Sequence, residues 1–372
     1  ANAKATPAAS GRSAEKPQVT AILVRPIHDA QVVRGDDGMD HVEYELLVVN
    51  AVSDPVTLSS VAVLNPAGKQ LDRIEGDALA AATQTLLEQT PTPVIPASAA
   101  VSVEVDLILK PGKVPERVTH RIAYTVPAGS QSAPVIGATE VHGPEVAINR
   151  RPATVIKPPL KGDGWLATTA CCMPNVHRDL RLAIDGRRIE TGETFAVDWG
   201  LVKNNRLYDG DGSMNEQYYG FGADVLAVAD GTVAFIQEGK PEQTPNAVVL
   251  AETQSDIGGN KVILKIGPKV FAAYEHLQTG SLTVKVGDKV KAGAPLAKLG
   301  NTGPSTGAHL HFGLLNRPDV AAGRALPFVI DRYTLAGTVD FGASEGDSLA
   351  ITPDSKQVRS AYPLYGGIQN YP

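Results

Sequence analysis

Apolar and polar residues alternate with a period of two in several short segments of the first third of the chain. The clearest of these segments are 19–27, 41–51, 56–65, 97–109 and 118–126. Successive side chains of a strand point to opposite faces, so this alternation predicts half-buried strands. Turn-forming residues at 35–38 and 65–68 separate strands, and a short helix is expected at 77–87. Strands at this spacing predict a β-sandwich of immunoglobulin or fibronectin type over 18–142.

A second series of apolar segments follows the proline- and glycine-rich residues 143–164, which are expected to form a linker. The strands expected beyond it are 194–202, 224–236, 246–252, 261–267, 270–277, 281–286, 294–300 and 308–315. They place a second, mainly β domain at 165–340. Residues 1–17 have the composition of a disordered N-terminus, and 341–372, rich in Gly, Ser, Asp and Pro, are expected to form a C-terminal tail.

Composition narrows the function without naming one. A length of 372 residues suits two or three domains. The formal net charge is -6 and no basic stripe is present, which argues against a nucleic-acid partner. No apolar run approaches the roughly 18 residues of a membrane span. The small residues at 1–4 resemble those around a signal-peptidase site, so we interpret the chain as an exported protein, secreted or periplasmic, whose signal peptide has been removed. A shortened cytosolic protein would begin in the same way.

The stretch 300–314, GNTGPSTGAHLHFGL, combines a tight loop with a short strand that carries two histidines. On a strand, His309 and His311 share one face, while Leu310 and Phe312 share the other. One interpretation is a metal ligand beside a proton-handling partner. The alternative is a pair of surface or hydrogen-bonded histidines.

A carboxylate and a further histidine strengthen the metal interpretation. Asp198 lies within an otherwise apolar strand, where a carboxylate is costly unless it is paired or binds a metal. His276 lies near the end of the strand expected at 270–277. Carboxylate and neutral imidazole are both normal zinc ligands, and a catalytic zinc site keeps one position open for water.

Several segments of the second domain carry a family resemblance, and they occur in the family's order. They are 222–233, 260–264, 274–277, 284–293, 299–303 and 309–312. Together they cover most of 195–314, which resembles the lysostaphin/LytM-type zinc endopeptidases that cut peptidoglycan cross-links. The N-terminal domain is not covered. The resemblance implies an antiparallel LytM-type β-sheet, bound Zn²⁺, and hydrolysis of amide bonds in peptidoglycan stem peptides or cross-bridges.

The resemblance also implies individual roles. Asp198 and His311 match two metal ligands of the family. His276 and His309 match the two histidines that flank the metal-bound water, one as general base or proton shuttle and the other at the oxyanion. The sequence does not divide these two tasks between them.

The family's first histidine ligand is displaced in this chain. Four residues before Asp198, where the family has that histidine, stands Thr194. The upstream histidine of this domain is His177, and we expect it to return beside Asp198 as the third protein ligand. The rival ligands are Cys171, Cys172, Asp179 and Glu193. The adjacent cysteines themselves form a vicinal disulfide, remain thiols or bind metal.

An insertion at 203–219 is the second departure from the family. Its alternating Asp209, Asp211, Ser213 and Asn215 resemble a calcium loop. Met214 and Gly220 replace the glycine and glutamate that such a loop requires, which argues against calcium. The loop either shapes a substrate groove, with Tyr218 and Tyr219 as contacts, or is a solvated surface loop.

Three functions compete. The first is an active zinc endopeptidase, which the retained Asp198, His276, His309 and His311 favour. The second is a non-catalytic LytM-like module that binds cell wall or regulates another cell-wall hydrolase. The third is a lipoyl or biotinyl carrier, suggested by 284–300, but the required lysine at a hairpin tip is not found. The sandwich either docks on the second domain, binds cell wall or occludes the groove, and the sequence does not choose among these.

Overall fold

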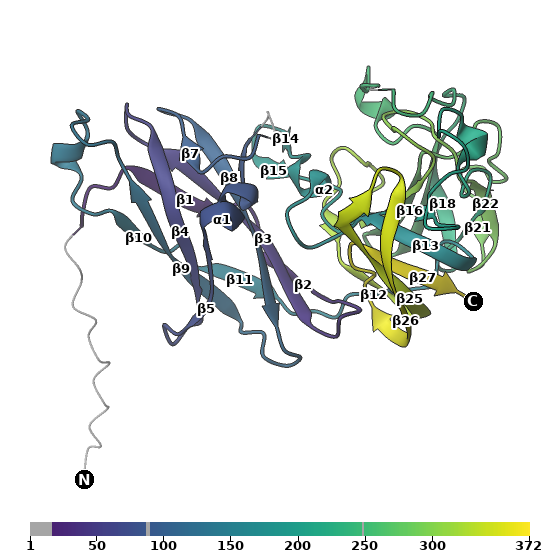
Figure 1. Ribbon diagram of the computed structural model, residues 1–372, viewed down its shortest axis with the longest axis horizontal. Helices are drawn as coiled ribbons and strands as arrows, with labels where there is room; N and C mark the ends of the chain where they lie inside the picture. The colour runs from purple at the N-terminus through teal and green to yellow at the C-terminus, as the bar shows by residue number, and fades with distance from the viewer. Residues whose placement is uncertain (1–16, 87–89, 248) are drawn as a thin grey trace, which may run out of the picture.

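The computed structural model describes residues 17–86, 90–247 and 249–372, and these residues form two β-rich bodies side by side (Figure 1). The first body is a β-sandwich, and the second is built on a large, almost entirely antiparallel sheet. The predicted fold class, mainly β with an N-terminal sandwich followed by a second β domain, is confirmed. Within the described residues no helix is long and apolar enough to cross a membrane.

The sandwich has two layers that a shared strand joins. Its elements are β1 (Ile22–Pro26), β2 (Ala30–Arg34), β3 (Asp40–Asn50), β4 (Val56–Leu64), β5 (Gln70–Glu75), α1 (Gly76–Ala82), β6 (Thr83–Thr85), β7 (Val94–Ile95), β8 (Ala100–Leu109), β9 (Arg117–Thr125), a 3-10 turn (Ala133–Val135), β10 (Glu140–His142) and β11 (Val146–Asn149). One layer has the order β5-β4-β9 and the other β2-β3-β8-β6, and β11 pairs with both β9 and β2. The expected helix at 77–87 begins one residue earlier and ends at Ala82, where β6 starts; residue 87 lies outside the described residues.

Both faces of the central strand β3 are buried. Its alternate residues Val42, Tyr44, Leu46 and Val48 lie in the apolar core between the layers. The residues between them on the other face, His41, Glu43 and Glu45, are only 4%, 0% and 1% exposed. A buried polar face must meet hydrogen-bonding or charged partners. Here they come partly from the sandwich, as His28 and Asp106, and partly from the second domain, as Arg178.

The second domain continues the chain through a long series of short strands. Its elements are β12 (Thr154–Ile156), β13 (Gly162–Thr169), α2 (Val176–Asp179), β14 (Leu182–Ile184), β15 (Arg188–Glu190), β16 (Val197–Leu201), a 3-10 turn (Asn215–Gln217), β17 (Asp224–Leu226), β18 (Gly231–Gln237), a 3-10 turn (Gln254–Asp256), β19 (Lys261–Gly267), β20 (Val270–Glu275), β21 (Lys289–Val290), β22 (Pro295–Lys298), β23 (Leu310–Leu315), β24 (Ala325–Leu326), β25 (Phe328–Glu345), β26 (Ser348–Ala361) and β27 (Gly367–Tyr371). The large sheet has the order β12-β25-β27-β13-β16-β23-β20-β19-β18-β21.

The two ends of this domain differ from the sequence interpretation. Residues 341–372, expected as a tail, form the end of β25 together with β26 and β27, and β27 pairs with both β25 and β13. Tyr362 and Tyr371 of this segment are 0% and 3% exposed, so it belongs to the domain core. Within the expected linker 143–164, β11 joins the sandwich and β12 pairs with β25. The strand expected at 281–286 is an irregular segment. The described residues of 246–252 form no strand either, and residue 248 lies outside them.

Candidate metal centre

Three adjacent strands of the large sheet place three ionisable side chains in a row. The register pairs Asp198 of β16 with His311 of β23, and His311 with Glu275 of β20. Directly paired residues project from the same face of a sheet. The neighbouring residues on the opposite face are Trp199, Tyr274 and Phe312, all 0% exposed. The apolar face of the sheet thus packs on the core, and Asp198, His311 and Glu275 project from the opposite face towards a groove.

His177, Asp198 and His311 form a group of suitable size for a metal ion. The Nε2 atom of His177 lies 3.1 Å from Oδ2 of Asp198, and Nδ1 of His311 lies 2.9 Å from Oδ1 of Asp198. One ligand atom from each residue lies within 4.8 Å of the others. Tetrahedral zinc with bonds of 2.0–2.2 Å sets its ligand atoms about 3.4 Å apart. Small side-chain movements therefore suffice to make these three groups zinc ligands.

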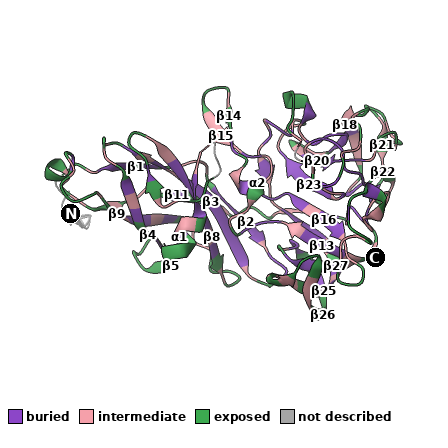
Figure 2. Ribbon diagram, turned by 45° about the horizontal axis from the view of Figure 1, so that its top comes forward, coloured by how far each residue is buried: buried purple, intermediate pink, exposed green. Residues whose placement is uncertain are grey.

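His177 reaches Asp198 through a short helix and a hairpin excursion. Asn175 caps the four-residue helix α2, and its Oδ1 accepts a hydrogen bond of 2.9 Å from the backbone N–H of His177. The chain then leaves through the β14–β15 hairpin, an outlying and largely exposed loop in Figure 2, before returning along β16. The structure thus brings His177 beside Asp198. Thr194 lies elsewhere, lining a small cavity with His28 and Glu43.

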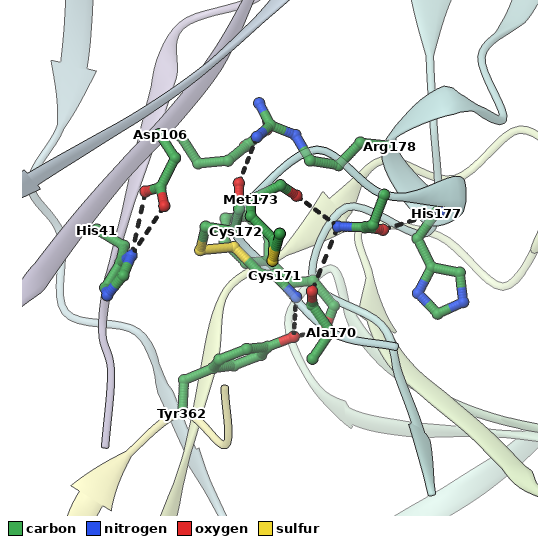
Figure 3. Close-up of a disulfide and its surroundings, with 12 residues drawn as sticks. His41, Asp106, Ala170, Cys171, Cys172, Met173, His177, Arg178 and Tyr362 are labelled. Carbon is green, nitrogen blue, oxygen red and sulfur yellow. Dashed lines mark hydrogen bonds and ion pairs between the residues drawn. A yellow bond between two sulfur atoms is a disulfide. The ribbon is translucent and has the colours of Figure 1, made fainter. Parts of the chain in front are cut away.

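The rival ligands named from the sequence are placed away from this group. Cys171 and Cys172 are joined by a disulfide, and both are buried. Figure 3 shows the disulfide to one side of α2, with the backbone N–H of Cys171 donating a 3.1 Å hydrogen bond to the hydroxyl of Tyr362. Among the described residues, neither Asp179 nor Glu193 falls in a metal-sized group.

His276 and His309 face the same groove beside the ligand group. Their ring centroids are 4.8 Å apart. Nδ1 of His276 donates to the Thr302 carbonyl at 2.8 Å, and Nδ1 of His309 donates to the Gly307 carbonyl at 2.8 Å. These bonds hold both rings with Nε2 towards the groove, where Nε2 of His309 also lies 3.4 Å from Oδ1 of Asp198. His276 also has a positive φ of 57°, a backbone conformation that is uncommon outside glycine and often occurs at functional sites.

The charges within the site stabilise one another. Burial acts to raise the pKa of Asp198, but the neighbouring His177 and His309 hold that pKa well below its ordinary range. Burial acts to lower the pKa of His311, whereas Glu275 and Asp198 outweigh burial and raise it to about 10. The pKa of His276 is lowered, first by burial and then by His309 and His311. An ionised carboxylate is thus held among imidazoles, as a cation-binding site requires.

The remaining nitrogen of each candidate histidine ligand has its own partner. Nδ1 of His177 donates to the Ala196 carbonyl at 3.2 Å, so Nε2 faces the metal position. Nε2 of His311 points to the buried carboxylate of Glu275 at 4.0 Å, so Nδ1 faces that position. Zinc-bound histidines typically have such a carbonyl or carboxylate partner. Two imidazoles and one carboxylate, with the fourth position open, fit a catalytic zinc site.

Sequence reasoning missed Glu275. The sequence signal was a carboxylate directly before His276 in an apolar strand. In the structure, burial raises the pKa of Glu275. Glu275 also explains Gly258, since a Cβ atom built at Gly258 would lie 1.8 Å from Oε2 of Glu275. A side chain at this position would displace the carboxylate.

A groove of about 420 Å³ opens in front of these residues. The ionisable groups occupy one side. Its apolar lining includes Val176, Leu180 and Leu182 from α2 and the start of β14, with Leu250, Ile257 and Val320. Neither Tyr218 nor Tyr219 of the insertion lines this cavity. Tyr218 instead lies against Gly307, next to the loop that fixes His309.

Comparison with known proteins gives a family match for the region that contains three of the four groove histidines. Residues 218–322 match the model of Peptidase family M23. The match contains His276, His309 and His311, whereas His177 and Asp198 precede it. The chain is 34% identical over 93 residues to "Peptidoglycan DD-endopeptidase ShyA" of Vibrio cholerae, covering 25% of this chain and 21% of that protein. It is 36% identical over 91 residues to an "Uncharacterized metalloprotease" of Haemophilus influenzae, covering 24% and 16%.

Solved structures give weaker similarities. The catalytic domain of the prophage-encoded M23 protein EnpA from Enterococcus faecalis, in a mutant form, is 21% identical with a TM-score of 0.27, covering 45% of this chain and 91% of that chain. The catalytic domain of lysostaphin from Staphylococcus simulans is 23% identical with a TM-score of 0.22, covering 33% and 86%. Scores of this size support no conclusion on function.

Proposed function

We propose, from the match of residues 218–322 to the model of Peptidase family M23, that the chain is a zinc-dependent endopeptidase of peptidoglycan. It hydrolyses amide bonds in stem peptides or cross-bridges through a metal-activated water. The peptidoglycan substrate is inferred from the name of the relative in Vibrio cholerae. A substrate in the cell wall requires export, so we also propose a secreted or periplasmic location.

The observation that carries this proposal is the convergence of five residues on one groove. His177, Asp198 and His311 form one metal-sized group. His276 and His309 stand beside it and form a second such group with His311. His177 and His311 turn a ring nitrogen towards the Asp198 carboxylate at 3.1 and 2.9 Å, and Nε2 of His309 approaches the same carboxylate at 3.4 Å. The division into ligands and proton-transfer residues therefore follows the family resemblance, and the metal-binding variants below test it. Four histidines with separate orienting partners are difficult to explain by packing alone.

His177, Asp198 and His311 would hold zinc, which would supply Lewis-acid polarisation of the scissile carbonyl and a lowered pKa of water, about 7. The chain supplies the proton transfers. A neutral Nε2 of His276 or His309 accepts the proton of the attacking water and returns it to the leaving amine. The Nε2–H of the other ring donates a hydrogen bond to the oxyanion. The hydrogen bonds to Thr302 and Gly307 keep both rings in place during these steps.

The experiment compares zinc content and peptidoglycan cleavage in the full-length chain and two variants. We expect wild type to hold about one zinc and to release peptide fragments identified by mass spectrometry. His177→Ala should lose both zinc and cleavage, because it removes a ligand. His276→Ala should keep zinc and lose cleavage by about 10²–10⁴-fold, because it removes a proton-transfer group. His142→Ala is the control, since that side chain is 62% exposed on the sandwich.

The outcomes separate the competing explanations. Retention of zinc and cleavage in His177→Ala would assign the third ligand to another residue. A wild-type protein that binds peptidoglycan but has neither zinc nor cleavage would refute the enzyme and favour a non-catalytic module. Loss of zinc in His276→Ala would contradict the division into ligands and proton-transfer residues.

A further inference from the structure

The residue that follows the candidate ligand His177 points into the other domain. Arg178 is 0% exposed although it belongs to the short helix α2. Its guanidinium donates to the backbone carbonyls of Tyr44 at 3.1 Å and Val105 at 3.2 Å, both in the sandwich. Figure 3 shows the two side chains leaving α2 in different directions, with His177 on one side and Arg178 reaching over the disulfide. One turn of helix thus joins the groove to the sandwich.

The sandwich presents a buried acidic surface to Arg178. The register of β3 and β8 pairs Glu43 with Asp106 and Glu45 with Glu104 on the outer face. Like charges directly opposite each other destabilise a sheet, and buried carboxylates need a partner. Arg178 lies 2.8 Å from Glu43 and 3.1 Å from Glu45. This acidic face therefore depends on cations delivered by other parts of the chain.

Further cations complete this surface. Arg181, two residues beyond α2, forms an ion pair with Glu104. His28 lies 2.7 Å from Glu45, and His41 lies 3.1 Å from Asp106. Both arginines come from the segment that carries His177, so their ion pairs act on the position of that segment, whereas the two histidine pairs lie within the sandwich.

Helix α2 is too short to be stable without contacts to the rest of the chain. It contains four residues, and a single turn of helix is not stable without tertiary contacts. The guanidinium of Arg178 also donates a hydrogen bond to the carbonyl of Cys172, and this bond ties the loop that precedes α2 to the helix. The side chains of Val176 and Leu180 are 51% and 40% exposed and so contribute little packing. Arg178 is thus the main buried anchor of the segment.

We propose that the N-terminal sandwich positions the first metal ligand, through the ion pairs of Arg178 with Glu43 and Glu45. Arg178 is a positioning residue: it touches neither substrate nor metal, and it holds α2 so that His177 faces Asp198. This inference rests on the proposed metal centre. The proposal gives the sandwich a structural role, which is to hold a metal ligand in place. A sandwich that only bound cell wall or only blocked the groove would not need the ion pairs with Arg178.

The test removes the anchor and neutralises its two nearest carboxylates. Arg178→Met alone would leave the buried carboxylates of Glu43 and Glu45 without this cation and could prevent folding. The main variant is therefore the triple R178M/E43Q/E45Q, in which these two partners are also neutral. Two quantities are measured on the full-length protein: the zinc dissociation constant, by competition with a chelator, and amide hydrogen exchange over 173–181 without metal. We expect zinc binding to weaken by about 10–100-fold, as when other supports of metal ligands are lost. Exchange over 173–181 should accelerate at least tenfold, because α2 loses its anchor.

The matched control is Tyr124→Phe, which removes a buried hydroxyl bonded to Ala21 and Ala138 within the sandwich. It lowers the stability of the same domain without touching α2, so zinc affinity and exchange over 173–181 should stay at wild-type values. If this control weakens zinc as much as the triple variant, general destabilisation is the cause and the positioning role is refuted. A folded triple variant with wild-type zinc affinity and exchange also refutes it. If wild type binds no zinc, the proposed function fails, and exchange over 173–181 alone decides whether the sandwich holds α2.

Discussion

The ion pair between His28 and Glu45 should make the stability of this protein depend on pH. The Nε2 atom of His28 lies 2.7 Å from Oε2 of Glu45, and the two side chains are 12% and 1% exposed. Burial acts to lower the pKa of His28, but the charge and hydrogen bond of Glu45 outweigh burial, and the pKa rises from 6.5 to about 9. The folded protein therefore binds this proton more tightly than the unfolded chain does.

The sign and size of the effect follow from this difference. A group with a raised pKa in the folded state contributes its full stabilisation below the unfolded value of 6.5, and that contribution is lost as the pH rises through about 9. The difference corresponds to roughly 3 kcal/mol in the free energy of unfolding, as an upper value. This is a large fraction of the stability of a typical domain.

The assay is urea unfolding followed by circular dichroism at pH 6 and pH 9.5, in wild type and His28→Gln. Glutamine keeps a hydrogen-bond donor near Glu45 and cannot carry the proton. The variant should be less stable than wild type by roughly 3 kcal/mol at pH 6 and nearly equal to it at pH 9.5. His142→Gln, an exposed histidine paired with exposed Glu140, is the control and should shift little at either pH. An equal gap between wild type and His28→Gln at both pH values would refute the reasoning.

Two further predictions concern the groove. Glu275→Gln keeps the volume of a buried side chain but removes the charge beside His311, so zinc affinity measured by chelator competition should fall about 10–100-fold. The control is Glu193→Gln, at a groove residue outside the ligand group, which should leave zinc affinity unchanged. Equal zinc affinities for the two variants would contradict the supporting role of Glu275. Leu182→Asp places a charge on the apolar wall of the groove, where the native side chain is 41% exposed, and should raise KM for peptide substrates several-fold at constant zinc content. Val286→Asp, at a 58% exposed position outside the groove, is its control, and an unchanged KM for Leu182→Asp would exclude the wall from substrate contact.

The parts of the site that lie on strands could be predicted from the sequence. The period of two places His309 and His311 on one face, and an isolated carboxylate in an apolar strand marks Asp198. Strand register then brings Asp198 beside His311 without any long-range information beyond the pairing of β16 with β23. His276 directly follows β20, the other neighbour of β23, and His309 directly precedes β23. The regular geometry of the sheet made these neighbours accessible to sequence reasoning.

The parts that depend on irregular or exposed segments could not be predicted in the same way. The expected tail at 341–372 carries little apolar alternation because most residues of β26 are exposed, as its burial pattern shows. Its strands are specified by pairing with β25, whose register with β26 extends over most of both strands. A hairpin that buries few side chains leaves only a weak periodic signal in the sequence. The same limit applies to α2, since four residues show no helical period.

The acidic face of the sandwich shows why the domain interface escaped the sequence interpretation. Glu43 and Glu45 alternate with apolar residues, a pattern that usually places the charged side chains in water. The structure buries both, because Arg178, more than 130 positions later, neutralises them. Only tertiary structure brings such distant charges together. In this chain the first candidate ligand lies on a separate segment from Asp198, and among the described residues only its ring contacts at Ala196 and Asp198 join it to the strand that carries Asp198. It requires an anchor from outside the sheet, and the buried arginine next to His177 connects it to the sandwich. If this is correct, the two domains cannot be separated without loosening the metal centre.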